Sequence, residues 1–95
     1  MSILVPNFKV ELASTISLTE IDGKLVLFSK DTGDFFGLNE SALFLLKNLL
    51  DTDFWQAVTA GAAEYAVTEQ AICDDLMELV TELEKQKLLR KLPLK

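Results

Sequence analysis

The 95-residue chain contains no histidine and only one cysteine, Cys73. Without histidine it lacks the most common general base of enzymes and the most common metal ligand. A single cysteine forms neither an internal disulfide nor a structural zinc site, and a free thiol is typical of a reducing compartment. The four glycines do not form a phosphate-binding loop or a dinucleotide fingerprint. We therefore expect a protein that is not an enzyme and that binds no metal and no cofactor.

Long apolar runs and an excess of positive charge are missing as well. No apolar run approaches the roughly 20 residues that span a bilayer. Residues 1–10 contain neither the basic segment nor the small-residue cleavage site of a signal peptide. The net charge of −6 repels a polyphosphate backbone. These absences predict a cytoplasmic protein without a nucleic-acid or membrane partner.

The composition that is present indicates a folded chain. Hydrophobic residues make up 49% of the sequence and charged residues 25%, whereas disordered chains have too few apolar residues to form a core. The length is sufficient for one modest core. We expect a single domain over residues 1–95.

The first half of the chain has the pattern of a small antiparallel sheet. Residues 1–15 show no clear period, and we interpret them as an N-terminal arm or a short edge strand. Residues 15–21 and 24–30 read as two strands joined by Asp22-Gly23, a strong hairpin signal. Residues 34–38 form a third, aromatic strand after a second turn. The sequence therefore predicts a three-stranded meander.

Helical signals begin at Asn39, a typical N-cap that precedes leucines at helical spacing. Asp53 caps a second predicted helix, which has Gly61 as its weak point. Thr68 caps a third, amphipathic helix, which we expect to continue through a basic segment until Pro93 ends it. Three strands followed by three helices predict an α+β fold with helices on one face of the sheet.

The acidic residues Asp74, Asp75 and Glu78 lie together on the last predicted helix. They lack the loop spacing and the glycine of an EF-hand, so we interpret them as a solvated helix face that could attract a basic peptide. The acidic neighbours disfavour a thiolate at Cys73, which we interpret as a small, half-buried apolar residue.

Four segments, in this order, resemble the PqqD-like family. They are Asp22-Gly23-Lys24-Leu25-Val26-Leu27-Phe28, Thr32-Gly33-Asp34-Phe35-Phe36-Gly37-Leu38-Asn39, Tyr65-Ala66-Val67 and Lys87-Leu88-Leu89. The resemblance covers residues 16–92 and implies a winged helix-turn-helix-like domain. It further implies a non-catalytic adaptor, or peptide chaperone, in the biosynthesis of a ribosomally synthesised and post-translationally modified peptide. Such an adaptor presents the leader of a precursor to a separate radical SAM enzyme, cyclase or leader protease.

The resemblance also implies where the leader binds, namely as an added strand beside the third strand and against the last helix. In this mode main-chain hydrogen bonds supply affinity and side-chain pockets supply sequence preference. The implied peptide-binding residues are Asp34, Phe35, Phe36, Gly37, Leu38, Ile72, Cys73, Leu76, Met77 and Val80. Strand alternation separates Phe35 from Phe36 and Leu38, so one aromatic ring either packs under the N-terminal arm or contacts the peptide.

Two other functions share this architecture. A winged-helix transcriptional regulator would bind duplex DNA in a salt-sensitive way, although the last predicted helix is acidic. A structural subunit would bind an enzyme without any affinity for the leader. An open strand edge allows self-pairing, so both a monomer and a dimer are compatible with the sequence.

Overall fold

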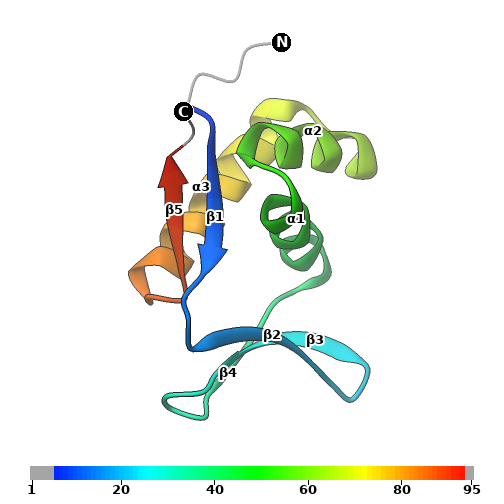
Figure 1. Cartoon of the computed structure of the whole chain (residues 1–95). Helices are drawn as coiled ribbons and strands as arrows, with labels where there is room; N and C mark the ends of the chain where they lie inside the picture. The colour runs from blue at the N-terminus through cyan, green and yellow to red at the C-terminus, as the bar shows by residue number, and fades with distance from the viewer. Residues whose placement is uncertain (1–5, 94–95) are drawn as a thin grey trace.

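The structure, a computed structural model, describes residues 6–93 (Figure 1). Its elements, in chain order, are β1 (Phe8–Leu12), β2 (Ile16–Ile21), β3 (Lys24–Ser29), β4 (Phe35–Gly37), α1 (Glu40–Asp51), α2 (Phe54–Tyr65), α3 (Glu69–Lys85) and β5 (Leu89–Pro93). The predicted three-stranded antiparallel sheet and the three helices that follow it are confirmed. β1 agrees with the short edge strand that was one interpretation of residues 1–15, whereas β5 and its pairing with β1 were not predicted.

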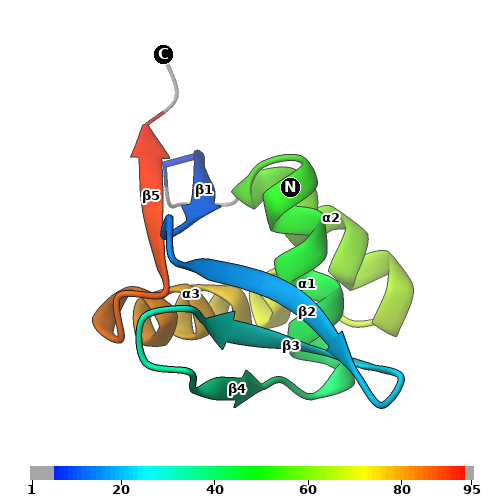
Figure 2. The same ribbon diagram turned by 60° about the horizontal axis from the view of Figure 1, so that its bottom comes forward.

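The sheet has the strand order β2-β3-β4 and lies in front of α1 and α3 when it is turned towards the viewer (Figure 2). Asp22 and Gly23 join β2 to β3 with φ values of +53° and +80°, as the hairpin signal requires. Gly33, with φ +76°, allows the tight return from β3 to β4. The local turn residues thus explain the meander.

The end of α3 corrects the predicted last helix. The helix ends at Lys85 rather than near Pro93, because Lys87 adopts a left-handed conformation with φ +63°. Leu88 and Leu89, each only 3% exposed, then enter the core. Their burial and the pairing of β5 with β1 outweigh the helical pattern that the leucines continue.

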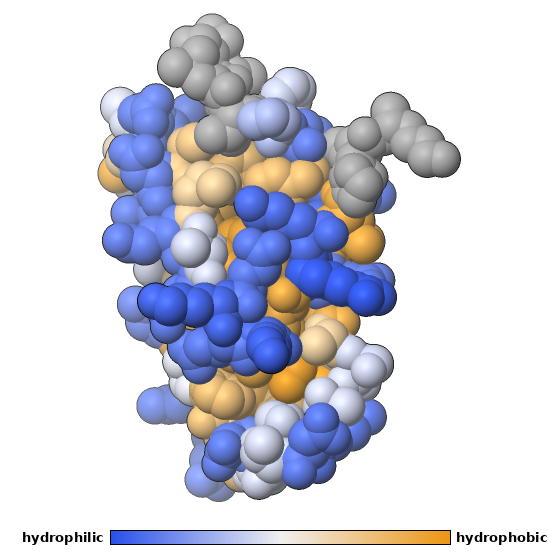
Figure 3. Space-filling view, turned by 90° about the vertical axis from the view of Figure 1, so that its left-hand side faces the viewer, coloured by the Kyte–Doolittle hydropathy of each residue, from blue (hydrophilic) through white to orange (hydrophobic). Residues whose placement is uncertain are grey.

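β1 and β5 form an antiparallel ribbon beside the helices (Figure 1). Phe8 and Val10 of β1 are buried in the core, and Glu11 forms an ion pair with Arg90 across the ribbon. Apolar surface appears between charged side chains on the face that Figure 3 shows. Residues 8–12 are therefore a strand, one of the two interpretations of residues 1–15, while residues 1–5 lie outside the described part of the chain.

Side chains cap all three helices as the sequence predicts. Asn39 Oδ1 accepts a hydrogen bond from the N–H of Ala42 at 2.8 Å. Asp53 and Thr68 cap α2 and α3 in the same way, at 2.9 and 3.1 Å. Each cap satisfies one of the backbone donors that a helix start leaves unpaired.

The core lies where the helices meet the sheet and the ribbon. Its largest fully buried side chains are Phe54, Leu27, Leu46, Leu49, Leu76, Val58 and Val80. Within residues 6–93, no helix is long and apolar enough to cross a membrane.

Candidate functional site

The outer edge of β4 is open. β4 is the last strand of the order β2-β3-β4, and no other described strand pairs with its outer side. The N–H of Ser29 donates to the carbonyl of Asp34 at 2.9 Å, and Phe36 is paired with Leu27. Because successive residues of a strand direct their backbone groups to opposite sides, the N–H and C=O of Phe35 and Gly37 point outwards. This edge can hydrogen-bond with a further extended chain.

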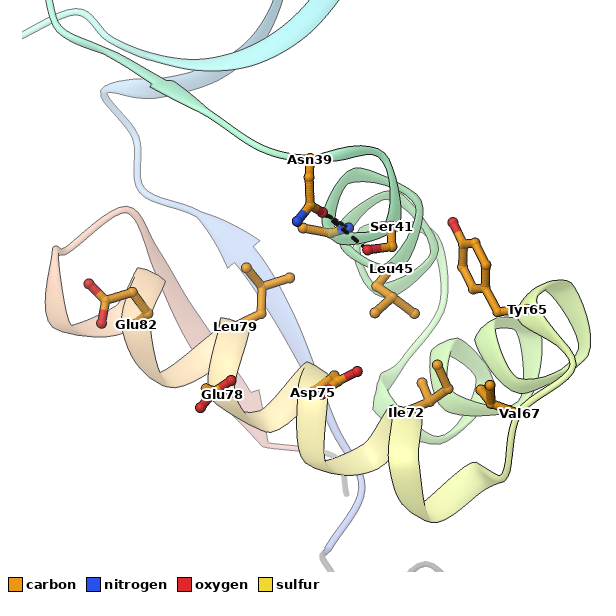
Figure 4. Close-up of a pocket in the computed structure, with 11 residues that line it drawn as sticks. Asn39, Ser41, Leu45, Tyr65, Val67, Ile72, Asp75, Glu78, Leu79 and Glu82 are labelled. Atoms are coloured by element: carbon orange, nitrogen blue, oxygen red, sulfur yellow. Dashed lines mark hydrogen bonds between the residues drawn. The ribbon is translucent and has the colours of Figure 1, made fainter.

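A groove of about 630 Å³ lies between α3, the start of α1 and the end of α2 (Figure 4). Asn39, at one end of the groove, follows β4 by two residues, so the groove adjoins the open strand. Leu45 of α1 and Leu79 of α3 extend into it from opposite sides (Figure 4). The lining residues are Asn39, Ser41, Ala42, Leu45, Tyr65, Val67, Ile72, Asp75, Glu78, Leu79 and Glu82.

The lining combines apolar and acidic groups. α3 contributes three carboxylates, and no lysine or arginine lines the groove. Glu82 accepts a hydrogen bond from Gln86 at 2.8 Å, whereas Asp75 and Glu78 have no hydrogen bond or ion pair within residues 6–93. The groove therefore suits an apolar side chain and a neighbouring positive charge.

The α2–α3 turn places two large side chains at the end of the groove. Ala66 ends α2 in a left-handed conformation, with φ +53°. Tyr65 and Val67, on either side of it, remain 39% and 44% exposed. The Tyr65 ring packs edge-to-face on Phe44 at a centroid distance of 5.6 Å, which fixes its position.

The β4 half of the predicted site lies at the open edge. Asp34, Phe35 and Gly37 are exposed, whereas Phe36 and Leu38 are half-buried against the core. Phe35 does not pack under β1. Its ring lies 4.8 Å from that of Phe28, on the face of the sheet opposite the core.

Of the five predicted site residues on α3, only Ile72 lines the groove. Ile72 does so although it is only 5% exposed, whereas Cys73, Leu76 and Val80 are buried in the core and do not line the groove. Met77 is half-buried against the core and does not line the groove. The apolar stripe of an amphipathic helix faces its own core, and for this reason most of the residues chosen along it are covered.

Sequence reasoning singled out Asp75 and Glu78 as an acidic helix face that could attract a basic peptide, but it missed Leu79 and Glu82 on the same side of α3. Asp75, Glu78, Leu79 and Glu82 recur at helical spacing, so they share one face. Leu79 is the apolar residue within this acidic set. That isolated apolar position was the available signal for the groove.

Cys73 is buried rather than half-buried as predicted, with only 6% of its surface exposed. Burial raises the pKa of its thiol, and the nearby charge of Asp74 raises it further. A protonated, covered thiol is not suited to nucleophilic chemistry. Within residues 6–93, no three His, Cys, Asp or Glu side chains are grouped to hold a metal.

Comparison with known proteins places these features in a family. A lasso peptide synthetase B1, solved in complex with the leader peptide, is 27% identical, with a TM-score of 0.78 over 90% of this chain and 99% of that one. TbiB1, solved in complex with the TbiA(beta) leader peptide, is 26% identical, with a TM-score of 0.75 over 84% and 94% of the two chains. No curated protein sequence matches the chain.

The family model of coenzyme PQQ synthesis protein D (PqqD) matches residues 24–89. This segment contains β3, β4, all three helices and the first residue of β5, and therefore every residue of the open edge and the groove. Because the match spans more than half of the sequence, the chain belongs to the PqqD family.

Proposed function

We propose that this chain is a leader-peptide-binding adaptor in the biosynthesis of a ribosomally synthesised, post-translationally modified peptide. The observation that carries the proposal is the open edge of β4 beside the groove along α3. Two structures with the same fold were solved with leader peptides bound, which supports the assignment. The leader adds a strand to β4, and its alternate side chains enter the groove.

The adaptor acts without catalysing a reaction itself. The groove contains no histidine and no thiol, and its acidic side chains are not grouped as a metal site within residues 6–93. We therefore propose that a separate chain, a radical SAM enzyme, a cyclase or a leader protease, modifies the precursor that this one holds. The free thiol of Cys73 favours the reducing cytoplasm as the place where this occurs.

Binding of the leader is tested by NMR on the ¹⁵N-labelled chain. The probe is the synthetic leader peptide of the precursor gene next to the gene for this chain. We expect the amides of Phe35 and Gly37, which point outwards, to shift and to gain protection from hydrogen exchange. The amide of Phe36 is paired with β3 and should be protected before the leader is added.

This alternation distinguishes strand addition from other modes of binding. Shifts confined to the β1–β5 ribbon, or an absence of shifts at saturating leader, would contradict the proposed function. A structural subunit would show neither change at β4, although it would still bind the modifying enzyme.

A further inference from the structure

Phe35 neither packs in the core nor lines the groove. It is 54% exposed, more than any other large apolar side chain among residues 6–93. Its neighbour Phe36 packs against the core, so alternation places Phe35 on the opposite face of the sheet. An apolar side chain this exposed on an open strand suggests a contact that forms on binding.

Phe35 is the outer end of a small apolar surface on that face. It is paired with Phe28 of β3, and the two ring centroids are 4.8 Å apart with an interplanar angle of 36°. Val26, opposite Gly37, extends the surface and is half-buried. Because β4 is the last strand, one side of the Phe35 ring has no neighbouring strand within residues 6–93.

The pairing of an added strand with β4 determines which of its residues would contact the Phe35 ring. The N–H and C=O of Phe35 point outwards, so a strand added antiparallel to β4 places one of its residues in a hydrogen-bonded pair with Phe35. Residues paired in this way direct their side chains to the same face of a sheet. This partner residue therefore lies against Phe35, on the opposite side of the added strand from α3 and the groove.

We infer that the leader is recognised on both faces of the added strand, and that Phe35 selects an aromatic or β-branched side chain at the position paired with it. The inference rests on the proposed function and adds a specificity-determining residue outside the groove. Gly37 presents no side chain on the same face, so the selection concerns one position of the leader. Cross-strand pairs of these types correspond to about a two- to fivefold change in affinity.

The test measures binding of the fluorescein-labelled synthetic leader of the neighbouring precursor gene by fluorescence anisotropy. We expect Phe35→Ala to weaken binding about two- to fivefold. Each leader residue is then replaced by serine in turn. At one position the replacement should weaken binding to the wild-type chain and have no further effect on the Phe35→Ala variant.

A matched control separates this contact from a general loss of apolar surface. Ile21 is 36% exposed on the same face but lies on β2, the outermost strand at the other side of the sheet from β4. Ile21→Ala should therefore leave the affinity for the leader unchanged. An NOE between the Phe35 ring and the selected leader side chain provides a second measurement in the wild-type complex, independent of any effect of Phe35→Ala on folding.

The possible outcomes distinguish the inference from the proposed function. If the leader shifts the Phe35 and Gly37 amides but shows no NOE to the Phe35 ring and no position coupled to it, the inference is wrong and the adaptor function stands. If the leader does not bind at all, both are wrong. Coupling at one leader position, together with the NOE, supports the inference.

Discussion

A β-carbon added to Gly61 of α2 would lie 2.6 Å from Cδ2 of Leu45 on α1. Cγ2 of Ile72 on α3 would be 3.0 Å away, so Gly61 lies where all three helices approach closely. A glycine that the sequence marks as a weak point in a helix is thus a packing contact. Because Leu45 and Ile72 also line the groove, this contact helps to shape the binding surface.

Gly61→Ala should lower the free energy of unfolding by about 1 kcal/mol. The substitution gains about 1 kcal/mol of helix propensity, but overpacking of the buried contact costs about 1–3 kcal/mol. Urea denaturation followed by circular dichroism measures the difference. Gly37→Ala is the control, because its added carbon meets nothing within 4 Å. An increase in stability for Gly61→Ala would show that the helices can separate without cost.

Gly37→Pro should weaken leader binding at least as much as the loss of one hydrogen bond, about fivefold. Proline removes the outward N–H, and an edge strand accepts proline where its N–H faces solvent. Gly37→Ala keeps this N–H and should bind the leader like the wild type. Anisotropy titrations measure both affinities. Equal affinities for the two variants would argue against main-chain pairing at Gly37.

Leu79→Ala should weaken leader binding about tenfold, since Leu79 extends into the groove that receives the leader side chains. Met77→Ala is a matched control, because Met77 is also half-buried on α3 but does not line the groove. Both variants remove a half-buried apolar side chain, so their stabilities should fall by comparable amounts. A larger loss of affinity for Met77→Ala would place the site on the other side of α3.

Cys73 should make the fold less stable at alkaline pH. Its pKa is raised in the folded chain by burial and then by Asp74, so the folded state holds the proton more tightly than the unfolded state. The stabilisation is complete below the pKa of the unfolded thiol and is lost as the pH rises through the folded one. Unfolding free energies of the wild type and Cys73→Ala, measured from about pH 7 to about pH 10, test this. The wild type should lose more stability than the variant over this range, and parallel curves would contradict the prediction.

Much of this protein follows from short-range signals in its sequence. Asp22-Gly23 favours a hairpin because both residues accept positive φ, and Asn39, Asp53 and Thr68 cap helices through hydrogen bonds to residues three positions later. These interactions involve neighbours in the chain, so residue types and spacing are enough to predict them.

The tertiary structure alone decided the rest. β1 and β5 lie at opposite ends of the chain, and their pairing has no local signal because it depends on Phe8, Leu88 and Leu89 filling one core. The stripe on α3 predicted which face is buried but not which flank adjoins β4. Leu79 lines the groove and Met77 does not. The packing of α1 and α2 against α3 decides which flank of α3 faces the groove.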